Sequence, residues 1–115
     1  MIKLGYYYLI KIMEIVDKNT FQEHVKSDGV VIVDFFADWC GPCQMLVPIL
    51  EDIQKELGEK VKIVKVDVDA SQDLAQEFSV SSIPTLVFFK GGEAKETVTG
   101  FQSKDALLQK IEELA

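Results

Sequence analysis

The seven residues Val30–Phe36 are the part of the chain that most constrains its fold. Six of them are β-branched or aromatic, and the single polar member is Asp34. A run of this kind is typical of a central strand buried on both faces, because a strand with one face in water alternates apolar and polar residues. The run therefore predicts a sheet with helices packed on both of its faces.

Strand and helix patterns alternate along the chain from Met13 onward. The capping-box sequence Thr20-x-x-Glu23 predicts the start of the first helix, and Pro48 inside the long helix predicts a kink there. The other expected elements are strands over residues 14–16, 61–68, 85–89 and 95–99, and helices over 43–57, over 71–78 and from the cap Ser103 onward. Helix-linked strands pair in parallel, whereas the Gly91-Gly92 turn joins an antiparallel hairpin. The chain is thus predicted to be an α/β fold, with a central mixed sheet of about five strands flanked by about four helices.

Composition places the chain among ordinary globular domains and excludes several classes of function. Its 115 residues fit one domain, and contents of 48% apolar and 27% charged residues argue against disorder, collagen and coiled coil. No apolar stretch approaches the roughly 20 residues that cross a bilayer. The 12 basic residues are all lysine and are outnumbered by 19 acidic ones, whereas a nucleic-acid binder needs clustered cations, often arginine. We expect a soluble monomer without a membrane or nucleic-acid partner.

The first twelve residues differ from the sequence that follows them. Segment 1–12 contains three consecutive tyrosines, several aliphatic residues and two lysines, but no acid. Its basic start and short apolar stretch are similar to a signal peptide, although an Ala-x-Ala-like cleavage site is missing. We interpret residues 1–12 as an extension of a domain that covers residues 13–115. A short added strand and an uncleaved export or anchoring signal are the alternatives.

The two cysteines of the chain, Cys40 and Cys43, are its strongest chemical signal. A disulfide scaffold joins distant cysteines, so a pair separated only by Gly41-Pro42 is either half of a metal site or a redox pair. Tetrahedral zinc needs four ligands, and the chain adds one histidine and no further cysteine. The expected position of Cys40 is a helix N-terminus, where unpaired N–H groups and the helix dipole stabilise a thiolate. We interpret the pair as redox-active, with a zinc-bridged dimer and inert core cysteines as alternatives.

Asp34 is the second unusual residue, because it interrupts an otherwise apolar central strand six positions before Cys40. Burial of an isolated carboxylate is unfavourable, so its pKa is expected to rise towards neutrality, as suits a general acid or base for thiol chemistry. The alternative is a structural aspartate satisfied by hydrogen bonds. Lys65, midway along the next strand, is either its ion partner or a lysine whose ammonium extends to solvent.

Two further features accompany the cysteines. Pro84, at the start of a strand in Ile83-Pro84-Thr85, is either a marker of an edge strand or a cis proline that exposes backbone groups to an extended peptide. Trp39, directly before Cys40, is expected to cover the loop and to contact partners rather than to fill the core.

Together these features resemble the thioredoxin family over about residues 13–115. The matching parts are DFFADWCGPC at residues 34–43, Pro48, Lys65 with the VDVD that follows it, Ile83-Pro84-Thr85, and Gly100 after the last strand. The combination of Trp-Cys-Gly-Pro-Cys with Ile-Pro-Thr roughly forty residues later is highly specific.

The resemblance implies the thioredoxin fold with Pro84 in cis and assigns a role to each matching residue. Cys40 is expected to attack the substrate disulfide, and Cys43, the buried thiol, to resolve the mixed disulfide. Asp34 is expected to exchange a proton with Cys43 through water, with Lys65 close enough to tune it. The implied docking surface consists of Trp39, Gly41, Pro42, Ile83, Pro84, Thr99 and Gly100.

Three positions depart from the family pattern. Phe36 stands where the family often has a second tryptophan, and Gln44 stands where lysine or arginine is common, which removes a cation near the thiols. Segment 1–12 has no counterpart in the family.

The resulting hypothesis is a thiol–disulfide oxidoreductase that reduces disulfides in other proteins through a Cys40–Cys43 dithiol–disulfide cycle. The resemblance implies no metal and no bound organic cofactor. It implies recharging by a thioredoxin reductase that draws electrons from NADPH or ferredoxin, and a cytoplasmic location. The alternative is a binding module that uses the same surface as a subunit of a larger complex.

Overall fold

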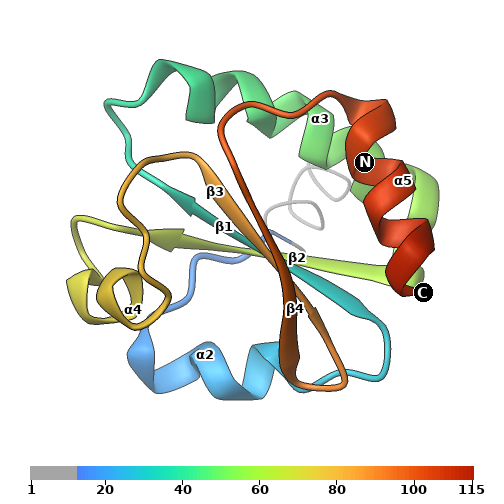
Figure 1. The fold of residues 1–115 in the computed structure, drawn as a ribbon, viewed down its shortest axis with the longest axis horizontal. Coiled ribbons are helices and arrows are strands. Elements are labelled where there is room, and N and C mark those ends of the chain that lie inside the picture. Colours follow the sequence, from blue (N-terminus) through green and yellow to red (C-terminus); the bar gives the residue numbers. More distant parts are fainter. Residues whose placement is uncertain (1–12) are drawn as a thin grey trace, which may run out of the picture.

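The computed structural model describes residues 13–115, which form one four-stranded sheet between two layers of helices (Figure 1). The predicted extension, residues 1–12, and its boundary with the domain lie outside the described residues. Along the chain the elements are α2 (Lys18–Val25), β1 (Val30–Phe36), α3 (Gly41–Leu57), the 3-10 helix η1 (Gly58–Lys60), β2 (Val61–Asp67), α4 (Gln72–Glu77), β3 (Thr85–Lys90), β4 (Glu93–Thr99) and α5 (Lys104–Leu114).

Strand β1 lies inside the sheet, whose order is β2-β1-β3-β4. It pairs in parallel with β2 and antiparallel with β3, and β3 turns at Gly91-Gly92 into antiparallel β4. Both turn glycines have positive φ, 61° and 80°, a conformation that residues with a side chain disfavour. All seven residues of β1 are buried, which confirms the central strand expected from its apolar run.

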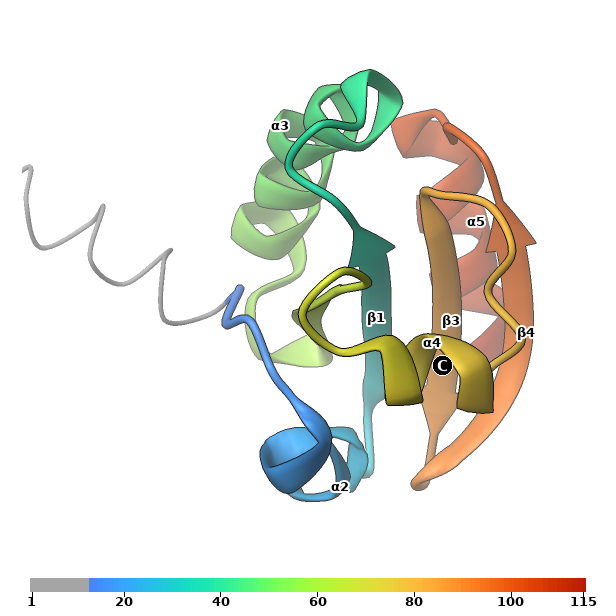
Figure 2. The same ribbon diagram turned by 90° about the vertical axis from the view of Figure 1, so that its left-hand side faces the viewer.

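Each face of the sheet is covered by two helices, and successive residues of β1 alternate between the two faces. Val31, Val33 and Phe35 pack with α2 and α4, whereas Val30 and Ile32 pack with α3 and α5. Figure 2 shows α2 and α4 lying apart from α3 and α5 around the strands. Among residues 13–115, none of the helices combines the length and hydropathy needed to cross a membrane.

Residues 14–16 do not form the additional strand that the sequence predicts. They make a single bridge, in which Ile15 pairs with Lys65, and backbone hydrogen bonds of 2.8 and 2.9 Å join this segment to β2. The pairing stops because the next residue, Asp17, already caps helix α2. The prediction of about five strands is therefore wrong, and the described sheet has four.

The start of α2 also differs from the prediction. The side chain of Asp17, not that of Thr20, caps the helix by accepting the N–H groups of Asn19 and Thr20 at 2.9 and 3.2 Å. Thr20 completes the capping box by accepting the N–H of Asp17. Aspartate and threonine are both favoured at the N-cap position, and the sequence pattern predicted Thr20 as the cap where the structure has Asp17. Ser103 caps α5 as expected, accepting the N–H of Ala106 at 3.1 Å.

Candidate active site

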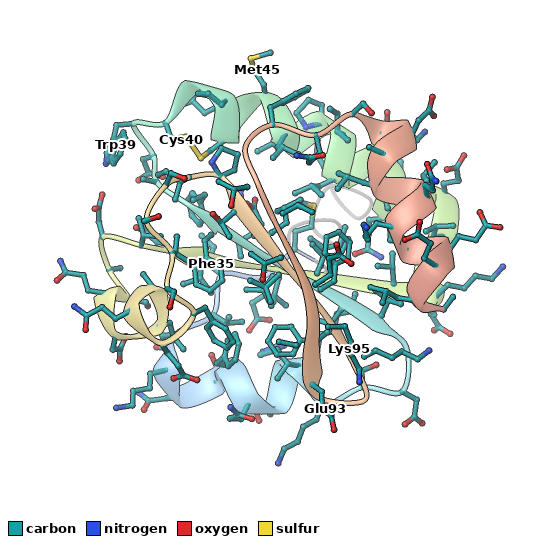
Figure 3. All side chains as sticks on the ribbon, in the orientation of Figure 1. Phe35, Trp39, Cys40, Met45, Glu93 and Lys95 are labelled. Carbon is teal, nitrogen blue, oxygen red and sulfur yellow. A yellow bond between two sulfur atoms is a disulfide. The ribbon has the colours of Figure 1, made fainter. Side chains whose placement is uncertain are left out.

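The loop after β1 places both cysteines at the N-terminus of α3, where they form a disulfide (Figure 3). Cys40 is the N-cap residue, and its Sγ accepts the backbone N–H of Cys43 at 3.2 Å. Pro42 fits the first helical turn because that position has no carbonyl partner for an N–H group. The first sulfur therefore lies at the end of a helix whose free N–H groups stabilise a thiolate.

Both sulfurs of the disulfide are largely covered. Cys40 is 5% exposed and Cys43 is 2% exposed, and they share a buried cluster with Phe36 and Ala37. Ile83, from the loop before β3, packs against this cluster.

Asp34 lies on β1, opposite Lys65 of β2 and Leu86 of β3, on the face that α3 and α5 cover. Its side chain is 0% exposed, and neither carboxylate oxygen has a hydrogen-bond partner among the protein groups. Burial raises the pKa of Asp34 from 3.8 to about 6, and the positive charge of Lys65 opposes this rise. The expected burial of Asp34 is confirmed, and no protein group supplies the hydrogen bonds that the alternative of a structural aspartate requires.

Lys65 is half-buried, and its backbone is hydrogen-bonded to the segment 14–16 on the side away from β1. Its ammonium Nζ lies 4.3 Å from the centroid of the Phe36 ring. The lysine therefore influences Asp34 through its charge, while its ammonium contacts an aromatic face.

The Ile83–Pro84 peptide bond is cis, as expected. The loop is held on both sides, since Thr85 Oγ1 donates to the Ser82 carbonyl at 2.6 Å and the Gly100 N–H donates to the Pro84 carbonyl at 2.8 Å. These contacts place the end of β4 beside the proline loop.

The predicted docking residues differ in exposure. Trp39, Gly41, Pro42 and Thr99 are exposed, Ile83 and Gly100 are half-buried, and Pro84 is buried. The fold brings them together from the α3 loop, the proline loop and the end of β4.

Trp39 is 71% exposed, and its indole N–H donates to Asp69 Oδ2 at 2.8 Å. A shallow hollow of about 340 Å³ lies beside the indole, lined by Trp39, Val68, Val80, Ser81, Ser82 and Ile83. Sequence reasoning assigned no role to Asp69 or to Val80, because 30 residues separate the tryptophan from its partner. No local pattern signals such a contact.

The thioredoxin family model matches residues 12–113 of the chain. This chain belongs to the thioredoxin family. Among curated relatives, the thioredoxin of Bacillus subtilis is 52% identical over 85 residues, which cover 74% of this chain and 82% of the relative. The thioredoxin of Rickettsia typhi is 47% identical over 97 residues, covering 84% and 92%.

Solved thioredoxin structures show the same architecture. A thioredoxin variant from Halobacterium salinarum superposes with a TM-score of 0.82 at 39% identity, covering 89% of this chain and 88% of that one. The thioredoxin of Malassezia sympodialis gives 0.79 at 38% identity, covering 89% and 90%. The predicted thioredoxin fold is confirmed.

Family membership and the Cys40–Cys43 disulfide together define the activity of this chain. It is a protein disulfide oxidoreductase that acts on disulfide targets through a dithiol–disulfide cycle with a mixed-disulfide intermediate. Among residues 13–115, no group of three or more histidine, cysteine, aspartate or glutamate side chains is arranged to hold a metal ion.

Proposed function

We propose that Cys40 is the nucleophile of this disulfide reductase and Cys43 its resolving thiol. The Cys40 thiolate attacks one sulfur of the target disulfide, forming a Cys40 mixed disulfide while the other target sulfur leaves and takes a proton. Cys43, as a thiolate, then attacks Cys40 Sγ, which forms the Cys40–Cys43 disulfide and releases the second target thiol. The observation that carries this order is the Cys43 N–H, which points at Cys40 Sγ from the helix end.

Asp34 is the proton acceptor for Cys43 in the second step, acting through water. A thiol with an ordinary pKa of about 8.5 is mostly protonated at neutral pH, so resolution needs a base. With a pKa of about 6, Asp34 is largely ionised at neutral pH yet remains basic enough to accept a proton. Lys65 tunes this balance through its charge.

The docking surface for target proteins comprises the residues around the disulfide: Trp39, Gly41, Pro42, Ile83, Pro84, Thr99 and Gly100. The exposed indole of Trp39 and the hollow beside it favour an apolar side chain near the target disulfide. Apolar contacts at this position orient the target sulfur towards Cys40.

The cycle is completed by another protein that reduces the Cys40–Cys43 disulfide. We propose a thioredoxin reductase that draws electrons from NADPH or ferredoxin, with no cofactor bound by this chain. The high identity to bacterial thioredoxins supports this partner. A monomer that works in the cytoplasm, where reducing systems keep thiols reduced, fits the same proposal.

Reduction of insulin disulfides tests these roles. The wild-type protein, supplied with NADPH and a bacterial thioredoxin reductase, should precipitate the insulin B chain and consume NADPH. Cys40→Ser should abolish the activity, whereas Cys43→Ser should accumulate a covalent complex with the target, visible on a non-reducing gel. A complex that forms in Cys40→Ser but not in Cys43→Ser would reverse the two assignments.

The role of Asp34 is tested on the second step alone. Starting from a preformed mixed disulfide on Cys40, release of the target should be about 10²-fold slower in Asp34→Asn, at the lower end for loss of a general base. In the wild type the release rate should rise with pH through about 6, the pKa of Asp34. Unchanged release in the variant across pH 6–9 would remove Asp34 from the reaction.

A further inference from the structure

Phe36 and Asp34 lie two positions apart on β1, so their side chains emerge on the same face of the sheet. Lys65 occupies the register position opposite Asp34 on β2. Its ammonium lies 4.3 Å from the centroid of the Phe36 ring, which is itself 7% exposed. The cation therefore lies diagonally across the strand pair, against a buried aromatic face.

A half-buried lysine on a strand ordinarily extends its ammonium into solvent. The face of an aromatic ring attracts a cation, and this attraction increases when the pair is partly removed from water. The Asp34 oxygens accept no hydrogen bond from the protein, so Lys65 is not held by a direct bond to the acid. The ring is thus the contact that keeps the ammonium in place.

We propose that Phe36 is a positioning residue, whose ring holds the Lys65 ammonium where its positive charge acts on Asp34. The functional meaning of this arrangement rests on the proposed role of Asp34 as proton acceptor for Cys43. Loss of the lysine charge would raise the pKa and leave the acid protonated at neutral pH.

Two acidic groups near Lys65 have partners of their own. Asp67 of β2 accepts the N–H groups of Asp69 and Ala70, and Glu14, on the segment that pairs with Lys65, contacts His24. Strand β3 contributes the uncharged Leu86 opposite Asp34, and α3 contributes Cys43, which is oxidised in the disulfide. Lys65 is accordingly the charge that the Phe36 ring can move relative to Asp34.

The experiment is a titration of Asp34 in the disulfide form, followed by the infrared carboxyl band that Asp34→Asn removes. Phe36→Leu removes the ring and should raise the pKa of Asp34 by about one unit, a tenfold change in its acid dissociation constant. Phe36→Trp keeps an aromatic face and should leave the pKa of Asp34 at about 6. Phe36→Met, an unbranched side chain that adapts to cavities, replaces Phe36→Leu if that variant does not fold.

The direction of the pKa change in Phe36→Leu distinguishes this proposal from one in which the ring only shields Asp34 from water. If the ring only keeps water away from Asp34, its removal hydrates the carboxylate and lowers the pKa. A lowered or unchanged pKa in Phe36→Leu overturns the proposal.

The same substitution in a Lys65→Met variant tests whether Phe36 acts on Asp34 through the lysine. In Lys65→Met there is no ammonium to hold, so adding Phe36→Leu should produce no further rise in the pKa of Asp34. A rise of the same size in both backgrounds overturns the proposal. The titration does not depend on turnover, so it tests Phe36 separately from the reaction. If Phe36→Leu raises the pKa of Asp34 but leaves the pH dependence of target release unchanged, the role of Asp34 as proton acceptor is refuted and the role of Phe36 is retained.

Discussion

The two faces of the sheet are built differently, although the same central strand supplies both. The face covered by α2 and α4 contains an aromatic cluster, in which Phe21, Phe35, Phe78 and Phe89 meet at ring-centroid distances of 5.4 to 5.9 Å. The face covered by α3 and α5 contains the buried Asp34. The first face is therefore stabilised by packed aromatic rings, whereas the second gives up stability to hold a reactive group.

The buried polar groups near α3 sharpen this contrast. Gln54 is also buried, but its amide nitrogen donates to the carbonyls of Gly58 and Val61 at 3.0 and 2.9 Å, while its Oε1 has no hydrogen-bond partner among the protein groups. Asp34 has no such partner. A buried polar group with partners supports the fold, whereas one without them destabilises it and is free for chemistry.

The largest expected effect lies on the aromatic face. Phe21→Ala should reduce the free energy of unfolding by about 3–5 kcal/mol, because the ring is 1% exposed and its loss leaves a cavity beside the rings of Phe78 and Phe89. Phe101→Ala is the matched control, since that ring is 45% exposed; its loss should change stability by only about 0.5 kcal/mol. Urea unfolding measures both. Equal losses in the two variants would refute the packing role of this face.

On the opposite face, Asp34→Asn should stabilise the oxidised protein at neutral pH. The folded-state pKa of Asp34 is raised from 3.8 to about 6, so the folded chain binds this proton more tightly than the unfolded chain. The resulting stabilisation is complete below pH 3.8 and is lost as the pH rises through about 6. At pH 7 the ionised carboxyl therefore disfavours folding by about 3 kcal/mol, which sets the upper limit of the gain in Asp34→Asn.

Unfolding in urea at about pH 4 and about pH 8 checks that expectation. The stability difference between Asp34→Asn and wild type should appear at the higher pH and nearly vanish at the lower one, where the wild-type carboxyl is protonated. A pH-independent difference would mean that ionisation of Asp34 is not its cause.

Gln54→Met should change the free energy of unfolding in the opposite direction to Asp34→Asn. The methionine has a similar shape but cannot donate to the two carbonyls, so the free energy of unfolding should fall by about 2 kcal/mol. Its effect should be the same at both pH values, because no titrating group is removed. A stability gain would show that these hydrogen bonds do not offset the burial of the amide.

The smallest expected effect is at the cap of α2. Asp17→Ala removes the acceptor for the N–H groups of Asn19 and Thr20, and should lower stability by about 1 kcal/mol without changing insulin reduction. Asp17→Ser, which retains a capping oxygen, should recover most of the loss. Reduced activity in the folded Asp17→Ala protein would link this face to the reaction.

Most elements could be predicted because their signals are local. The apolar run of β1, the Gly91-Gly92 turn and the cap at Ser103 each depend on a few neighbouring residues, and the structure bears out all three. The additional strand was mispredicted because a strand pattern does not show how much pairing the next helix allows. Asp17 begins that helix before residues 14–16 can form more than one bridge.

The sequence by itself determined the redox pair and the unusual acid. Both signals, Cys-Gly-Pro-Cys before a helix and one aspartate in an apolar strand, depend only on residues that are close together in the sequence. Only the tertiary structure decided that Lys65 lies over Phe36 and that Asp69 holds Trp39. Those contacts join residues about 30 positions apart. They depend on the register of β1 and β2 and on the path of the loops, which form only when the two faces of the sheet are packed.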